Sequence, residues 1–292
     1  RIDPIFKSKE DKMAFDERHK KDQIPVLDIK DQKGELYLGL DAGSTTTKAV
    51  VINKKGELVY TYYASNKGNP VMSAVNIMKD IYSKMPEDCY LAHSCVTGYG
   101  ENIIKAALNI DIGEIETMAH FQSAKFFCPN VDFIIDIGGQ DTKLILVDDG
   151  MVKDFIMNDK CSAGTGRFLE VMANTLGVRP DALCELASLG GGTSISSMCT
   201  VFAESEVISL IGRGEKKENI AFAVVDSIVK KVGSQAGRLA VQGDVCLTGG
   251  LCEFPYLKQS LSQHLGKPVH ACPDGRYAGA IGAALSAAKI RK

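Results

Sequence analysis

Two short stretches place an aspartate, glycines, hydroxyl or amide side chains and a lysine in the same order. "LDAGSTTTK" runs from Leu40 to Lys48, and "DIGGQDTK" runs from Asp136 to Lys143. Glycine lets backbone approach a phosphate without a Cβ in the way, and N–H groups and hydroxyls supply the donors that phosphate oxygens need. The pattern is not a Walker A loop, because it lacks G-x-x-x-x-G-K-[ST] and leads into a strand. Both stretches predict phosphate-binding turns.

The chemistry of each side chain suggests its role. Asp41 and Asp136 are suited to hold Mg²⁺ through water, since Mg²⁺ prefers carboxylates and keeps several waters. Either Gln140 or Asp141 is suited to orient an attacking water, because positioning and charge neutralisation dominate phosphoryl transfer. A third turn, Gly249–Gly250 in "CLTGGLCEFPYL", follows an apolar strand and can accept a flat ring such as adenine. The candidate cofactor-binding residues are Gly43, Ser44, Thr45, Thr46, Lys48, Gly138, Gly139, Gly164, Gly166, Gly249 and Gly250.

Any one of these turns is also compatible with an ordinary β-turn. Three of them in this order, each after an apolar strand, instead favour a nucleotide cleft with facing hairpins for the β- and γ-phosphates.

Two of the nine cysteines, Cys161 and Cys199, lie at or just before the predicted helices 165–176 and 201–212. The positive end of a helix favours negative charge and therefore a metal-binding thiolate. Two thiolates cannot complete a four-thiolate iron–sulfur site, but a two-fold symmetric dimer brings the same pair from each subunit. The sequence contains no C-x-x-C, so a zinc ribbon is not indicated. The remaining cysteines are interpreted as small packed side chains: Cys89, Cys95, Cys128, Cys184, Cys246, Cys252 and Cys272.

The two phosphate stretches belong to a repeat of strand, turn, strand, turn and strand, spaced about 95 residues apart. Strands alternate with helices throughout, which predicts an α/β protein of two lobes with a cleft between them. The expected strands are 36–40, 48–53, 57–64, 90–96, 112–116, 132–137, 142–147, 151–157, one in "VCLTGG" and 268–271. The expected helices are 71–84, 100–108, 118–127, 165–176, 180–188, 201–212, 217–241, 254–265 and 276–290. The expected divisions are a polar leader with one short helix (1–34), lobe I (35–131 plus 276–292) and lobe II (132–275).

Composition excludes several classes of protein. The 292 residues are 45% hydrophobic and 24% charged, with a formal net charge of -2. No basic field therefore points to nucleic acid or an anionic membrane surface. No apolar run approaches the ~18 residues of a membrane span, no signal-peptide core is seen, and the odd number of cysteines suits reduced thiols in the cytoplasm.

The two phosphate motifs and "LTGG" resemble those of the superfamily of sugar kinases, heat-shock chaperone ATPases and actin. The resemblance implies two ribonuclease-H-like lobes hinged about ATP, with the last helix returning to the first lobe. "CSAGTGRFLEVMA" and "SSMCTVFAESEVISL", set between these motifs, resemble the activator ATPases of 2-hydroxyacyl-CoA dehydratases and the similar ATPase subunits of benzoyl-CoA reductase (BadF/BadG/BcrA/BcrD-type ATPases). The resemblance covers about residues 36–290. The leader resembles the segment before a second activase module in long, multi-module members.

The family resemblance implies that Cys161 and Cys199 ligate one [4Fe–4S] cluster shared by a homodimer. It also implies an ATPase that takes electrons from ferredoxin or flavodoxin. The electrons would pass singly to a 2-hydroxyacyl-CoA dehydratase or a related iron–sulfur reductase. Two alternatives remain open from the residues: a small-molecule kinase with Asp136 as its base, and a non-catalytic nucleotide-sensing module with packed cysteines.

Overall fold

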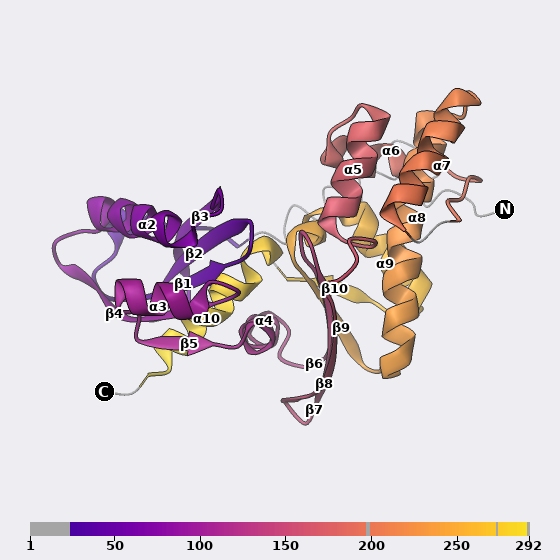
Figure 1. Ribbon diagram of the computed structural model, residues 1–292. Helices are drawn as coiled ribbons and strands as arrows, with labels where there is room; N and C mark the ends of the chain where they lie inside the picture. The colour runs from indigo at the N-terminus through magenta and orange to yellow at the C-terminus, as the bar shows by residue number, and fades with distance from the viewer. Residues whose placement is uncertain (1–23, 197–198, 273, 291–292) are drawn as a thin grey trace. The chain divides into compact units, whose positions relative to one another are not determined.

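The computed structural model describes residues 24–196, 199–272 and 274–290 (Figure 1). The chain divides into two compact units, each with its own five-stranded sheet. The N-terminal unit comprises residues 23–129 and 277–292, and the central unit includes residues 130–276. Most of the predicted leader lies outside the described residues, and its described part contains only the short 3₁₀ helix η2 (Ile29–Asp31).

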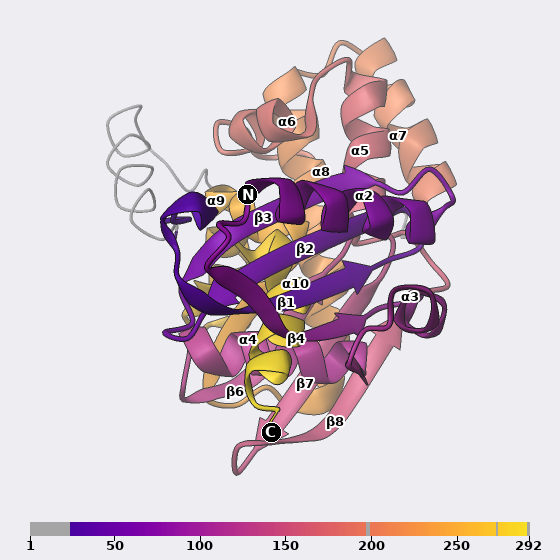
Figure 2. The same cartoon turned by 90° about the vertical axis from the view of Figure 1, so that its left-hand side faces the viewer.

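The N-terminal unit is built on a mixed sheet in the order β3-β2-β1-β4-β5. Its strands are β1 (Gly34–Ala42), β2 (Thr46–Asn53), β3 (Leu58–Ser65), β4 (Cys89–Thr97) and β5 (Ile112–Glu114). Its helices are α2 (Pro70–Lys84), α3 (Glu101–Leu108), α4 (Glu116–Phe127) and α10 (Ala278–Ala288). Apolar side chains cover both faces of the sheet, with α2 and α3 on one side and α10 on the other (Figure 2).

Helix α10 fits into this unit because its sequence, "AGAIGAALSAA", is made of small residues. A Cβ at Gly39 of β1 would lie 2.0 Å from the carbonyl oxygen of Ala280. A Cβ at Gly282 would lie 1.7 Å from the carbonyl oxygen of Ala119 in α4. Helix α10 therefore packs backbone to backbone between the sheet and α4, at a distance that only glycine permits at these positions.

The central unit repeats the same topology in the order β10-β9-β6-β7-β8. Its strands are β6 (Val131–Ile137), β7 (Thr142–Asp148), β8 (Met151–Asn158), β9 (Asp244–Thr248) and β10 (Val269–Ala271). Its helices are α5 (Gly166–Leu176), α6 (Pro180–Ala187), α7 (Thr200–Gly212), α8 (Lys217–Ala236) and α9 (Pro255–Leu265), with 3₁₀ turns η3 (Gly237–Leu239), η4 (Gly250–Glu253) and η5 (Gly275–Tyr277). In each unit three antiparallel strands are followed by two parallel ones, so the predicted α/β class with two related halves is confirmed.

Several helix bounds differ from the sequence prediction, and two of these differences have a clear structural cause. The helix predicted to run over 217–241 ends at Ala236, because the chain tightens into η3 at Gly237 and turns back at Ala240, which has a φ of 48°. The last helix begins at Ala278 rather than 276, because η5 precedes it. Within the described residues, no helix is both long and apolar enough to cross a membrane.

Candidate functional site

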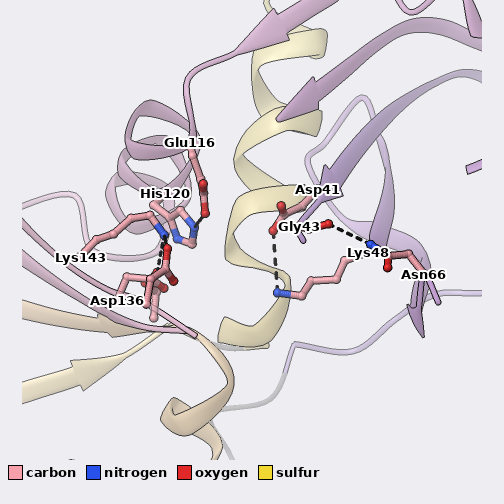
Figure 3. A network of polar contacts seen from close by, with 10 residues as sticks. Asp41, Gly43, Lys48, Asn66, Glu116, His120, Asp136 and Lys143 are labelled. Carbon is pink, nitrogen blue, oxygen red and sulfur yellow. Dashed lines mark hydrogen bonds and ion pairs between the residues drawn. The ribbon is translucent and has the colours of Figure 1, made fainter. Parts of the chain in front are cut away.

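The first phosphate turn joins β1 to β2 in the N-terminal unit. The Gly43 N–H donates to the Thr46 carbonyl at 2.9 Å, which closes the turn. Asp41 lies directly across the hairpin from Lys48, whose Nζ is 3.8 Å from Asp41 Oδ2 (Figure 3). The Asn66 side-chain amide donates to the Gly43 carbonyl at 2.9 Å and holds the turn from the end of β3. Asn66 is a positioning residue that the sequence analysis did not identify.

Asp41 is buried by two glycines from distant segments. A Cβ at Gly98, after β4, would lie 2.9 Å from Asp41 Oδ1, and one at Gly279, in α10, would lie 2.6 Å from Oδ2. Asp41 is consequently only 6% exposed. The sequence analysis missed both glycines. A signal was available for Gly98, which follows an apolar strand as Gly43 does.

The second phosphate turn joins β6 to β7 in the central unit. The Gly138 N–H donates to the Asp141 carbonyl at 2.9 Å. Asp136 is buried, and its Oδ1 accepts a 2.8 Å hydrogen bond from the hydroxyl of Thr248 in β9. Lys143 is also buried, and its ammonium lies 2.7 Å from Asp141 Oδ2 and 3.6 Å from Asp136 Oδ2 (Figure 3). Gln140 is exposed at the tip of the turn.

The Gly249–Gly250 turn lies beside the second phosphate turn. Gly249 has a φ of 91°, and a Cβ there would lie 2.2 Å from the Ile137 carbonyl oxygen and 3.0 Å from Asp136 Oδ1. The Gly249 N–H donates to the Gly275 carbonyl at 2.9 Å. The central unit therefore brings two of the predicted nucleotide turns together through the parallel pairing of β6 with β9.

The two candidate cluster cysteines occupy neighbouring segments of the central unit. Cys199 is exposed and is the N-cap residue of α7, whereas Cys161 is half-buried and precedes the first residue of α5, Gly166, by five positions. The hydroxyls of Ser162 and Thr200, each the next residue after a cysteine, are hydrogen-bonded at 2.8 Å. Both thiols therefore lie at the same end of the α5–α7 pair.

Two further hydrogen-bond sets fix the segments that carry the cysteines. The Thr175 hydroxyl of α5 donates to Glu204 Oε1 of α7 at 3.1 Å, so the helices are joined a second time along their length. Glu206 accepts from both the N–H and the hydroxyl of Ser196, at 2.8 Å each, and so holds the loop before Cys199.

The start of α5 is bonded directly to the second phosphate turn. The N–H of Gly166 donates to the Gly138 carbonyl at 2.9 Å, and the N–H of Arg167 donates to the Gly139 carbonyl at 2.8 Å. The turn thus satisfies two of the amides that a helix N-terminus leaves unpaired. Gly164, with a φ of 81°, is held through its carbonyl by the Thr142 hydroxyl at 3.5 Å.

The other cysteines have different surroundings. Six of them are buried, and burial raises the pKa of Cys95, Cys184 and Cys252 to about 12. Among the described residues, no three His, Cys, Asp or Glu side chains are grouped to hold a metal ion. Of the described cysteines in the central unit, only Cys161 and Cys199 are not buried, and this pair would fit half of a four-thiolate iron–sulfur site.

The duplicated sheets, each with an aspartate-bearing hairpin, define the actin-like fold. A glucokinase of the ROK family from Streptomyces griseus shares the fold with a TM-score of 0.58 at 14% identity, over 87% of this chain and 100% of that one.

The chain belongs to the BadF/BadG/BcrA/BcrD ATPase family, whose profile matches residues 38–287. It is 38% identical to the (R)-2-hydroxyglutaryl-CoA dehydratase activating ATPase of Acidaminococcus fermentans over 256 residues, which span 86% of this chain and 96% of that protein. It is also similar to the structure of the activator of the 2-hydroxyisocaproyl-CoA dehydratase from Clostridium difficile with bound ADPNP. That match has a TM-score of 0.80 and 34% identity, over 87% of this chain and 94% of the other.

Proposed function

We propose that this protein is an ATP-dependent activator that delivers low-potential electrons, one at a time, to a 2-hydroxyacyl-CoA dehydratase or a related iron–sulfur reductase. The observation that carries the proposal is the pair of hydrogen bonds from Gly166 and Arg167 to the second phosphate turn. They connect a predicted nucleotide-binding element directly to the helix that follows Cys161. A phosphate-binding turn and a candidate metal ligand are therefore adjacent parts of one structure.

The nucleotide part of the proposal rests on the three glycine turns. The Gly43–Thr46 and Gly138–Asp141 turns bind the phosphates, and the Gly249–Gly250 turn binds the adenosine. Asp41 and Asp136 are each the last but one residue of a buried strand, as suits carboxylates that hold Mg²⁺ through water. Gln140 or Asp141 orients the attacking water. The ADPNP bound to a relative of 34% identity supports this assignment.

The redox part of the proposal rests on Cys161 and Cys199. A homodimer would contribute four thiolates at its two-fold axis, and the [4Fe–4S] cluster they hold would store one electron at low potential. Helix α7 carries exposed Val201, Phe202 and Ile208 in the same segment as Cys199. An exposed apolar face of this kind is suited to burial against a second copy of the chain.

Coupling follows from the bonds that connect these parts. A change in phosphate contacts at Gly138 and Gly139 moves the carbonyls that hold the first amides of α5. Helix α7 follows, because the Ser162–Thr200 and Thr175–Glu204 hydrogen bonds join it to α5. The segments that carry the two thiols therefore respond together to the state of the nucleotide. Reduced ferredoxin or flavodoxin is the proposed electron donor.

The proposal is tested on the protein purified without oxygen. We expect a brown dimer with about four irons per dimer, an ATPase activity that needs no phosphoryl acceptor, and ATP-dependent reduction of an added dehydratase. A small-molecule kinase would instead lack iron and transfer phosphate to an acceptor, and a nucleotide-sensing module would be colourless and would not hydrolyse ATP. A monomer that stays iron-free after anaerobic reconstitution would refute the proposed iron–sulfur cluster and the electron transfer that depends on it.

Gly166→Ala is expected to weaken coupling more than it weakens ATP hydrolysis. A Cβ at Gly166 would lie 3.2 Å from Gly139 Cα and 3.4 Å from the Gly138 carbonyl oxygen, so the phosphate turn must shift by a few tenths of an ångström. The number of electrons delivered per ATP should fall by roughly tenfold, since small misplacements in such sites have large kinetic effects. Gly237→Ala is the control, because its Cβ meets open space. An unchanged electron yield in Gly166→Ala would rule out coupling through the contact between α5 and the second phosphate turn.

A further inference from the structure

The two phosphate hairpins share one feature of register. Asp41 pairs across its hairpin with Lys48, and Asp136 pairs across the other with Lys143. In the N-terminal unit the ammonium is 3.8 Å from its carboxylate and the lysine side chain is 22% exposed. In the central unit the lysine side chain is 1% exposed and contacts a second carboxylate, that of Asp141, at 2.7 Å. The aspartate–lysine pair is therefore fully buried only in the hairpin of the central unit.

The partners of Asp136 show what a metal ion would meet there. Its Oδ1 accepts the Thr248 hydroxyl at 2.8 Å, and its Oδ2 lies 3.6 Å from the Lys143 ammonium. A buried carboxylate is tolerated because such groups compensate it. The Lys143 ammonium therefore repels a cation that approaches the Asp136 carboxylate. The repulsion is strong because Lys143 is buried and little water screens its charge.

The charge balance of the hairpin depends on what else is bound. The side chains of Asp136, Asp141 and Lys143 together carry one net negative charge. They hold a divalent cation poorly, because the ammonium is buried between the two carboxylates. Nucleotide phosphates add several negative charges at the same turn. Only then does the local charge favour a divalent cation, because the phosphates also supply oxygen ligands.

We propose that Lys143 is an internal counter-ion that keeps the second phosphate turn from loading a divalent cation until nucleotide arrives. The inference rests on the proposed binding of Mg²⁺ and ATP at this hairpin, and it deepens that proposal by setting an order of binding. Metal enters with the nucleotide, and in the nucleotide-free hairpin the Lys143 ammonium offsets part of the charge of the two carboxylates. Lys48 is not assigned this role, because its side chain is 22% exposed and water screens its charge.

The test measures Mn²⁺, as a paramagnetic probe for Mg²⁺, by the free-ion signal in electron paramagnetic resonance. The nucleotide-free protein is titrated as wild type, Lys143→Met and Lys143→Arg. Lys153→Met is the control, because Lys153 forms a 2.7 Å ion pair with Asp148 that is exposed and lies in the same unit. We expect weak binding by the wild type and a gain on the order of 100-fold in Lys143→Met, from loss of a positive charge close to the metal. Lys143→Arg and Lys153→Met should bind like the wild type. Adding Asp136→Asn to Lys143→Met should remove the gain.

Stability gives a second readout. Lys143→Met leaves two carboxylates without their ammonium, so its melting temperature should fall and should be restored by Mn²⁺. A wild type that binds Mn²⁺ as tightly without ADP as with it would overturn the proposal, and that measurement requires no variant to fold. A folded Lys143→Met with no gain in affinity would also overturn it. ATP binding by the wild type is measured separately at equilibrium. A wild type that does not bind ATP would refute the proposed function itself.

Discussion

Replacing Cys161 by serine is expected to abolish iron binding while the protein still binds ATP. A serine hydroxyl is a poor ligand for iron–sulfur clusters, and in a symmetric dimer one substitution removes two of the four thiolates. Iron should fall from about four per dimer to nearly none. The change is measured by iron analysis and visible absorbance after anaerobic purification. Cys199→Ser should give the same result.

The control for this experiment is Cys128→Ser. Cys128 is half-buried like Cys161 but belongs to the N-terminal unit. It should retain full iron content. Retention of iron by both Cys161→Ser and Cys199→Ser would show that other residues hold it. Loss of ATP binding together with iron would assign these cysteines a structural role instead.

Asp136→Asn is expected to lower ATP hydrolysis by roughly 10²–10³-fold, a usual effect of removing one electrostatic contact in a catalytic site. Asparagine keeps the size of the side chain but removes the charge that we propose for Mg²⁺. The substitution keeps the ion pair between the buried Lys143 ammonium and the Asp141 carboxylate. The measurement is phosphate release at saturating Mg²⁺ and ATP, beside a nucleotide-binding assay.

Asp154→Asn provides the comparison, because Asp154 is an exposed aspartate of β8 in the same unit. It should hydrolyse ATP at the wild-type rate. A rate of ATP hydrolysis in Asp136→Asn within threefold of the wild type would exclude Asp136 from the catalytic site. Asp41 would then be the remaining candidate for the Mg²⁺ carboxylate.

The glycine turns and strands could be predicted from sequence because their signals are local. An aspartate at the end of an apolar strand, followed by glycine, predicts the position of a turn whatever lies around it. The same holds for Cys199, since the apolar period of "VFAESEVISLI" predicts the start of α7. The two-unit α/β class followed from the repeat of the hairpins.

The residues that complete each turn could not be predicted in this way. Gly98 follows an apolar strand and carried a local signal, but Asn66 and Gly279 reach the first turn from the end of β3 and from α10, which only the packing of these segments brings together. Thr248 reaches Asp136 only because β9 pairs in parallel with β6. Such contacts depend on long-range strand pairing, and no pattern within a short window of sequence encodes them.

The position of α10 has a consequence for how the chain folds as it is synthesised. Domains generally fold as units during synthesis, with the earlier one first. Here α10, which fills the space between the sheet and α4 of the N-terminal unit, is made only after all of residues 130–276. The first five strands therefore wait, with one apolar face uncovered, while the central unit is completed. A nascent chain of this kind would be most exposed to aggregation and chaperone capture just before α10 emerges from the ribosome.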